Sequence, residues 1–552
     1  MRPTRWRRST HVAVGAAVLL LVAVVVAAAA LMTRGESPAE LAVEPAPAPA
    51  TAEPAVVPVA DTADAPTPAG LAAALAPVLA DPNLGRFTGR ITDAMTGEEL
   101  WALGAGVPMQ PASTNKTLTA AAALLTLDRD ARLTTRVREG DQPGVVVLVG
   151  GGDQTLSAAP RNEDSWYRDA ARIVDLADQV RRSGVTVRAV QVDVSAYSGP
   201  TMALGWDPLD IDGGDIAPME SVMLDGGRTQ PVTVESRRSR TPALDAGRAL
   251  AVALRVGPAK VTVLPPGRAG TGENDTVIAS VQSPPLMQRL RDMMNFSDNV
   301  MAESIGREVA AELDRPQSFD GGARAVLASL DDAGIDTTGA RLFDSSGLSV
   351  DNRLTAETLD EVVNAAVGDD HPRLRPLVDL LPIAGGSGTL SNRYLDTDEG
   401  RAAAGYLRAK TGSLTGTNSL AGIVTDESGR VLTFALLSND AGPSGRTALD
   451  AFAATLRSCG CRAWARLPGR DSRSVVRSTG SWPPRSAASW PVRNPPLRTT
   501  PAGRRSSSSP SRPAHPRSRS ARSPVSTRAV RFPRRESSTG PSGFALQLSP
   551  CG

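Results

Sequence analysis

Apolar and polar residues divide the chain into an apolar N-terminal segment, a long mixed region and a polar C-terminal end. Residues 12–32 form an unbroken apolar run without charge, and four arginines stand within the first eight residues. About 20 apolar residues suffice to cross a bilayer, and arginines in front of them predict that this end stays in the cytoplasm. We therefore expect residues 1–34 to be a transmembrane anchor or a signal segment, with the anchor favoured and cleavage left open.

The mixed region begins after an Ala- and Pro-rich linker over residues 35–69, a composition that predicts an extended chain. Short apolar runs at 86–93 and 98–102, joined by a turn through Thr96-Gly97, predict a β-hairpin. The Ala/Leu-rich run over 117–127 contains no Gly or Pro and predicts a helix. A strand pair that leads into a helix is typical of an α/β architecture.

The stretch over residues 136–284 is long enough to be a separate domain inserted into the first one. Its Val-rich run at 145–149 predicts a strand. The glycines that follow lack the Gly-Lys-Ser/Thr of a phosphate-binding loop, so they predict a plain turn. The pattern further predicts a helix over 165–183 and strands near 185–194, 231–236 and 260–264. We therefore expect a β-rich insert.

Helical patterns return after residue 285. Apolar periodicity predicts helices over 286–295 and 300–313, and Thr355 is positioned to cap a helix that ends at Val367. Three antiparallel strands and a closing helix are then predicted over 406–411, 419–425, 431–438 and 448–457. Residues 70–135 and 285–461 are thus expected to be two parts of one α/β (α+β) domain.

Composition changes sharply after residue 461. Residues 462–552 are dominated by Arg, Ser and Pro, lack lysine and carry Asp471 and Glu536 as their only acids, a composition that predicts disorder. A basic tail would suit anionic wall polymer or nucleic acid. We favour an out-of-frame translation of a GC-rich gene, which detection of this tail in the natural protein would refute. The net charge of +2 argues against a dedicated nucleic-acid binder.

Lysine is rare in this chain, so each lysine position is informative. The 60 basic residues include only three lysines, Lys116, Lys260 and Lys410. Arginine does not lose its proton at ordinary pH, so a retained lysine favours a need for an amine that does. Lys116 follows Ser113 by three residues, which places both on one face of a helix. An amine of lowered pKa beside a serine activates the hydroxyl as a nucleophile, whereas Lys260 is expected at the surface.

Three short motifs contain two of these lysines. Ser113-x-x-Lys116 is followed by Ser297-Asp298-Asn299 and then by Lys410-Thr411-Gly412. Each motif is weak evidence when taken alone. The first occurs often by chance, the second is also found in helix-capping loops, and the third is also found in surface turns. Together and in this order they are the signature set of the penicillin-recognising serine enzymes.

The motifs predict acyl transfer through a serine ester. Ser113 is expected to attack a carbonyl with Lys116 as the base, while Ser297 relays the proton to the leaving amine. The remaining motif residues, Asp298 among them, are expected to bind the substrate. Asn299 is expected to hold its amide, and Lys410 is expected near its carboxylate, where Thr411 and Ser413 form hydrogen bonds. Gly412 is expected to leave room for the substrate backbone. Backbone N–H groups at Ser113 and near Ser413 are expected to hold the oxyanion.

Other mechanisms receive little support from the sequence. Of the three histidines, only His371 falls in the mixed region, in a stretch typical of a surface loop, so a Ser-His-Asp triad is not expected. Cys459 and Cys461 have no histidine at ligand spacing, which argues against zinc, and a disulfide between them would be strained. We expect no metal and no organic cofactor.

The three motifs resemble those of the D-alanyl-D-alanine carboxypeptidases/endopeptidases among the class C low-molecular-mass penicillin-binding proteins. Residues 224–227, 344–348, 352–353 and 381–390 also look like that family, and so does the long stretch between the first two motifs. The resemblance covers residues 71–461. It implies a transpeptidase-like domain, an antiparallel sheet with helices, that carries an inserted region. It also implies cleavage of the terminal D-Ala of peptidoglycan stem peptides on the cell-wall side, with β-lactam antibiotics as covalent inhibitors.

Two other functions stay open at this stage. A β-lactamase-like serine hydrolase needs fast deacylation from an added general base, and no Glu is convincingly placed for that role. A non-catalytic cell-wall-binding module that keeps the fold would be expected to carry a broken motif, and no motif is broken. The sequence leaves undecided the oligomeric state and whether endopeptidase activity accompanies the carboxypeptidase activity.

Overall fold

The computed structural model describes residues 20–21, 23–24, 63–234, 236–265 and 276–458. Most of the predicted anchor and most of the linker lie outside the described residues. So do Cys459, Cys461 and the whole Arg/Ser/Pro-rich tail. Within the described part of the chain, no helix is both long and apolar enough to cross a membrane.

An antiparallel sheet with the strand order β2-β1-β10-β9-β8 forms the centre of the first domain. Its strands are β1 (Arg86–Asp93), β2 (Glu99–Leu103), β8 (Leu407–Leu414), β9 (Thr417–Thr425) and β10 (Val431–Asn439). Arg86 lies opposite Asn439, so the pairing of β1 with β10 joins the two parts of the chain that flank the insert. The predicted hairpin and the three predicted C-terminal strands are confirmed.

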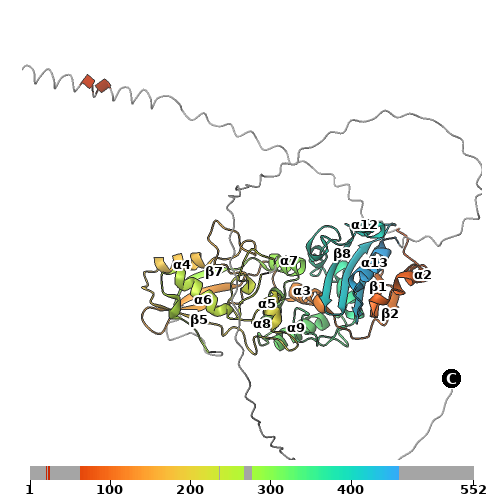
Figure 1. Ribbon diagram of the computed structural model, residues 1–552, viewed down its shortest axis with the longest axis horizontal. Helices are drawn as coiled ribbons and strands as arrows, with labels where there is room; N and C mark the ends of the chain where they lie inside the picture. The colour runs from red at the N-terminus through yellow and green to blue at the C-terminus, as the bar shows by residue number, and fades with distance from the viewer. Residues whose placement is uncertain (1–19, 22, 25–62, 235, 266–275, 459–552) are drawn as a thin grey trace, which may run out of the picture. The chain divides into compact units, whose positions relative to one another are not determined.

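Helices cover both faces of this sheet. Phe434 and Leu436 on β10 point to the face that packs on α2 (Pro68–Leu79) and α13 (Gly445–Ser458). Their neighbours Ala435 and Leu437 point to the opposite face and its helices, as the period of two along a strand requires. Figure 1 shows α2 and α13 beside the strands of this sheet.

The second face of the sheet is covered by α3 and the helices around it, which supply much of the core. They are α3 (Asn115–Thr126), α7 (Leu286–Phe296), α8 (Asn299–Glu312), α9 (Phe319–Asp332), α10 (Ala356–Val367) and α11 (Pro376–Leu380). Residues 115–124 of α3 are all buried, because the small side chains of Ala120–Ala123 let α8 and α9 pack closely on it. Thr355 caps α10 as predicted, accepting a hydrogen bond from the Thr358 N–H at 3.0 Å. The helix α9 is not among the predicted elements.

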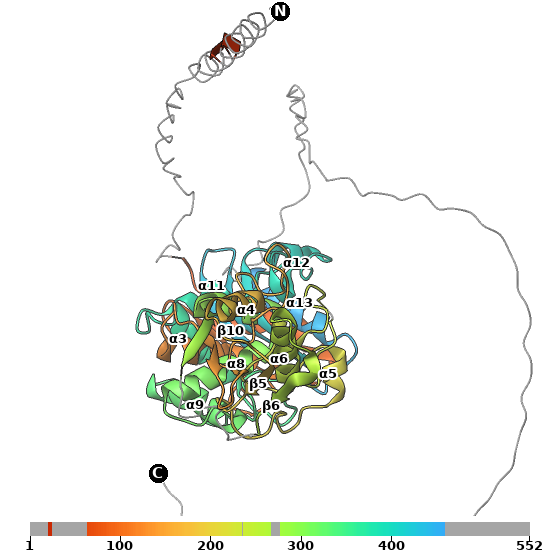
Figure 2. The ribbon, with the colours of Figure 1, turned by 90° about the vertical axis from the view of Figure 1, so that its left-hand side faces the viewer.

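The insert contains a second five-stranded sheet, in the order β6-β5-β4-β3-β7. Its elements are β3 (Thr134–Glu139), β4 (Val145–Val149), α4 (Ile173–Arg182), β5 (Ala189–Asp193), α6 (Pro242–Ala253), β6 (Val261–Val263) and β7 (Val277–Gln282). The strands β4, β5 and β6 run parallel, and parallel neighbours need a crossover, here the helices α4 and α6. Both helices pack on one face of the sheet (Figure 2).

Several expectations for the insert need correction. It is a mixed α/β layer rather than a β-rich one, because the crossovers between its parallel strands are helical. The helix expected over 165–183 is confined to α4, no strand forms over the described residues of 231–236, and the sequence pattern missed α6, β3 and β7.

Candidate active site

Ser113 lies in a tight turn in front of the buried helix α3. The turn is a short 3₁₀ segment, Ala112–Thr114, so the α-helix begins two residues after Ser113. Ala112 has a φ of 48°, a left-handed conformation that is strained for a residue with a side chain. Gly412 on β8 packs so closely on this turn that a Cβ there would lie 2.7 Å from the carbonyl oxygen of Pro111. The edge strand therefore packs directly on the turn that carries Ser113. The expected role of Gly412, to leave room for a substrate backbone, stays a prediction.

Lys116 is completely buried and has three hydrogen-bond acceptors around its amine. Its Nζ lies 3.0 Å from Ser113 Oγ, 2.6 Å from Asn299 Oδ1 and 2.7 Å from the carbonyl oxygen of Ser346. Burial lowers the pKa of Lys116 to about 8, although nearby carboxylates oppose the shift. A fraction of this amine is therefore neutral near neutral pH, and a neutral amine beside a hydroxyl can accept its proton.

Ser297 is paired with the second buried lysine of the site. It ends α7 in a left-handed conformation with a φ of 55°, which turns the chain into α8. Lys410 Nζ donates to Ser297 Oγ at 3.0 Å and to the carbonyl oxygen of Thr411 at 2.9 Å. Burial lowers the pKa of Lys410 well below its ordinary range, and the positive charges of Lys116 and Arg393 lower it further. The two buried lysines therefore disfavour being charged at the same time.

Asn299 begins α8 and connects the site to the insert. Its Oδ1 accepts from Lys116, while its Nδ2 donates to the backbone carbonyl of Asp215 at 3.2 Å. The three motifs are thus brought together as the sequence predicts, since Ser113 contacts Lys116, Lys116 contacts Asn299, and the Ser297–Lys410 pair lies beside them.

Asp298 differs from the substrate-binding residue that the motif predicts. Its buried carboxylate accepts hydrogen bonds from the Tyr167 hydroxyl at 2.6 Å and from the Met301 N–H at 3.1 Å, and Arg228 lies 3.5 Å away. Burial alone would raise its pKa, but the positive charges of Arg228 and Arg238 outweigh that effect and lower the pKa of Asp298 to about 2. Its side chain therefore joins the insert to the second motif, and substrate binding by Asp298 stays a prediction.

The other predicted substrate-binding residues lie on the edge strand β8. The Thr411 hydroxyl is 2.8 Å from that of Thr389, which belongs to the loop over 381–390. Ser413 is exposed, whereas Gly412 is buried against Ser419 of β9. The exposed Ser413 hydroxyl and the buried, hydrogen-bonded Thr411 hydroxyl lie two residues apart on an edge strand. This arrangement suits the binding of an extended peptide end.

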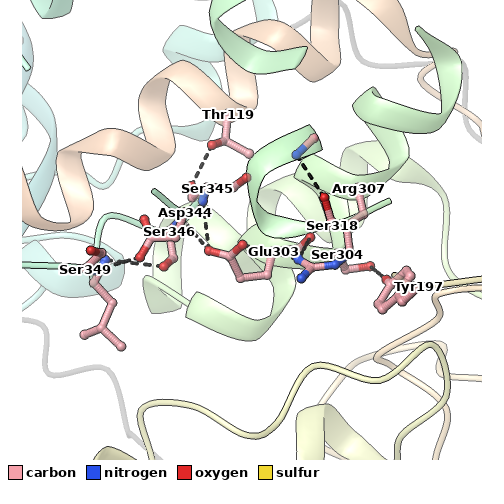
Figure 3. A network of polar contacts seen from close by, with 12 residues as sticks. Thr119, Tyr197, Glu303, Ser304, Arg307, Ser318, Asp344, Ser345, Ser346 and Ser349 are labelled. Atoms are coloured by element: carbon pink, nitrogen blue, oxygen red, sulfur yellow. Dashed lines mark hydrogen bonds and ion pairs between the residues drawn. The ribbon is translucent and has the colours of Figure 1, made fainter. Parts of the chain in front are cut away.

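Sequence reasoning missed a network of polar side chains around the loop of Asp344, Ser345 and Ser346, which Figure 3 shows. Asp344 accepts from the Ser349 N–H at 2.7 Å and from Trp206 Nε1 of the insert at 2.8 Å. Glu303 accepts from two backbone N–H groups of the same loop. The resemblance of residues 344–348 to a known family was a signal for the loop, but nothing in the spacing identified Glu303.

The described part of the chain contains no cluster of three or more His, Cys, Asp or Glu side chains that would hold a metal ion. His371 lies in the loop between α10 and α11, beside two exposed aspartates.

This arrangement places a buried lysine amine, 3.0 Å away, beside the Ser113 hydroxyl. Residues 71–237 and 230–456 match the D-Ala-D-Ala carboxypeptidase 3 (S13) family, and residues 1–58 match the N-terminal domain of Carboxypeptidase Rv3627c-like proteins. The chain therefore belongs to the D-Ala-D-Ala carboxypeptidase 3 (S13) family, as the resemblance in the motifs predicts, and it is a serine-type D-alanyl-D-alanine carboxypeptidase.

Individual relatives agree with this assignment. Carboxypeptidase DacB of Mycolicibacterium smegmatis is 74% identical over 464 residues, which are 84% of this chain and 100% of that protein. The D-alanyl-D-alanine carboxypeptidase of an Actinomadura species is 30% identical over 69% of this chain and 83% of its own length. The crystal structure of penicillin binding protein 4 from Haemophilus influenzae, 22% identical, matches with a TM-score of 0.57 over 70% of this chain and 98% of that one. This last likeness concerns the fold, which is the mixed α/β fold expected.

Proposed function

We propose that Ser113 is the nucleophile and that Lys116 is its base. The observation that carries this proposal is the 3.0 Å contact between Lys116 Nζ and Ser113 Oγ, made by an amine whose pKa burial lowers to about 8. The amine takes the hydroxyl proton while Oγ attacks the carbonyl carbon of the penultimate D-Ala. The bond to the terminal D-Ala then breaks, and water later hydrolyses the Ser113 ester.

The Ser297–Lys410 pair is proposed to serve the leaving group. The Ser297 hydroxyl, 3.0 Å from Lys410 Nζ, donates a proton to the departing amine and regains one from the lysines. The carboxylate of the terminal D-Ala would lie near Lys410, Thr411 and Ser413. Because an anion nearby favours the charged form of a lysine, substrate binding is expected to move a proton onto Lys410 and to leave Lys116 neutral.

The proposed substrates are peptidoglycan stem peptides, with β-lactam antibiotics as covalent inhibitors. Support comes from the intact motifs and from the relatives, among which penicillin binding protein 4 has been solved with a β-lactam. Cleavage of peptide cross-links uses the same acyl-enzyme and is proposed as a second activity. A β-lactamase-like hydrolase is the alternative, and it would need an added general base for deacylation; the buried Glu303 carboxylate is hydrogen-bonded to the backbone N–H groups of Ser345 and Ser346.

A substrate in the cell wall requires the site to lie outside the cytoplasm. We propose that residues 1–34 bring the enzyme there as an anchor or a signal, because residues 12–32 are apolar and the arginines precede them. Extraction of the natural protein from membranes with detergent, compared with salt, would separate the two possibilities.

Covalent labelling of the full chain by a fluorescent penicillin tests the proposal. We expect stable labelling that Ser113→Ala abolishes and Lys116→Ala slows by at least 100-fold, within the usual contribution of a general base. Lys260→Ala is the matched control, because Lys260 is exposed and should leave labelling unchanged. Rapid loss of the label would favour a β-lactamase, and a folded protein that is never labelled would favour a wall-binding module.

A further inference from the structure

Glu303 lies on α8, one helical turn after Asn299, and its side chain is completely buried. Its Oε1 accepts hydrogen bonds from the backbone N–H groups of Ser345 at 2.9 Å and Ser346 at 2.8 Å. Its Oε2 accepts from Arg307 Nη1 at 3.3 Å. Figure 3 shows the carboxylate between this loop and Arg307.

A buried carboxylate is costly to maintain, so its position needs a reason. Burial raises the pKa of Glu303 to about 7, even though Arg307 and the two loop N–H groups favour the charged form. An apolar side chain would avoid this cost but would leave both N–H groups of the loop without an acceptor. The loop that Glu303 holds also carries the Ser346 carbonyl oxygen that Lys116 contacts.

The geometry at Lys116 shows what the Ser346 carbonyl does. A neutral amine has two N–H donors and one lone pair. The Ser346 carbonyl at 2.7 Å and Asn299 Oδ1 at 2.6 Å are both acceptors and occupy the two N–H groups. The remaining direction leads to Ser113 Oγ at 3.0 Å. Two fixed acceptors therefore direct the lone pair of the amine at the hydroxyl whose proton it must take.

We propose that Glu303 is a positioning residue, which holds the Ser345–Ser346 backbone so that the Ser346 carbonyl orients the lone pair of Lys116 toward Ser113. The loop is held from the opposite side by Thr119 of α3, whose hydroxyl donates to the Ser345 carbonyl at 2.6 Å. This inference rests on the proposed role of Lys116 as the base.

The charge of Glu303 gives the proposal a second readout. Lys116 is also influenced by charged groups on every element packed around it, namely Asp344 in the loop, Asp298 at the start of α8, Asp215 in the insert and Lys410 on β8. Removing one carboxylate from this set makes the ammonium form less favourable. The pH at which acylation reaches half of its maximum rate should therefore fall.

The test measures the penicillin acylation rate of the full chain against pH for wild type, Glu303→Met, which removes both the acceptor and the charge, and the control Asp360→Leu. Asp360 is an equally buried carboxylate on α10 that accepts from Thr92 at 2.5 Å and is not among the groups that influence Lys116. Glu303→Met is expected to slow acylation roughly tenfold or more, as misplacement of a reacting group does, and to shift the midpoint to lower pH. Asp360→Leu should change neither quantity.

Equal rates and equal midpoints for wild type and a folded Glu303→Met would overturn the inference. If Glu303→Met does not fold, Thr119→Val is the second test, because it removes the other support of the loop without a change of size. A rate like that of wild type would then overturn the inference. Absence of labelling in wild type, or labelling of Ser113→Ala, would instead contradict the proposed function, so the two failures are distinguishable.

Discussion

Replacement of Arg228 by methionine should destabilise the enzyme through Asp298, although Arg228 lies 70 positions away in the sequence and in the insert. Both side chains are buried, with exposed fractions of 5% and 1%. The methionine keeps an apolar stem like that of the arginine but removes the guanidinium group and its charge. Asp298 would keep the Tyr167 hydrogen bond and the more distant charge of Arg238.

The size of the effect follows from the pKa of Asp298. Its environment lowers that pKa from 3.8 to about 2, which corresponds to about 2 kcal/mol of folding free energy at neutral pH. Because the pKa of Asp298 is lower in the folded state than in the unfolded state, its stabilisation is fully present above about pH 4. The stabilisation is lost as the pH falls toward the folded-state pKa of about 2. Since burial opposes ionisation, loss of Arg228 should raise the pKa and remove most of this stabilisation, so we expect a loss of about 2–3 kcal/mol at pH 7.

A double-mutant cycle with Arg228→Met, Asp298→Asn and the double variant measures this coupling, with the free energy of unfolding taken from urea denaturation at pH 7. The coupling should be about 2 kcal/mol. The exposed pair of Arg324 and Asp320, with exposed fractions of 69% and 74%, is the matched control and should give less than about 0.5 kcal/mol. A coupling no larger than that of the control would refute the claim that Arg228 stabilises the second motif through Asp298.

Three further outcomes are expected of the site. The acylation rate of wild type should rise with pH through about 8 and then level off, because Lys116 acts only in its neutral form; a flat profile from pH 6 to 9 would contradict this. Lys116→Arg should lower the acylation rate by about 10²–10⁴-fold, measured beside Lys260→Arg, which should leave it unchanged. Gly412→Val should fold poorly or acylate slowly, since a Cβ would lie 2.1 Å from Ser419 Oγ; normal acylation kinetics in a folded variant would show that the strand can shift.

The chemistry of the site was largely readable from the sequence. Retained lysines in an arginine-rich chain indicated amines that must lose a proton, and Ser113, Lys116, Ser297, Asn299 and Lys410 do lie together. These residues are recognisable because the reaction demands particular functional groups at short spacing within each motif. The roles proposed for them remain predictions that the labelling experiments test.

The elements were readable where a local pattern was strong. The hairpin, the three C-terminal strands and the cap at Thr355 are confirmed, since alternation and capping are properties of neighbouring residues. In the insert the pattern missed α6 and predicted a strand over 231–236 that is absent from its described residues. Short apolar runs do not distinguish a strand from one turn of a buried helix, so tertiary packing decided these segments.

By itself, the sequence determined the family, the type of reaction and the order of the catalytic motifs, because these depend on side-chain chemistry at fixed local spacing. Only the tertiary structure decided which groups control that chemistry. Lys116 contacts Asn299 across 183 positions and the Ser346 carbonyl across 230, and Asp298 is held by Tyr167 and Arg228 of the insert. Hydrogen bonds and charges act through distance in space, which local sequence patterns do not encode, so Glu303 and Arg228 became visible only in the folded chain.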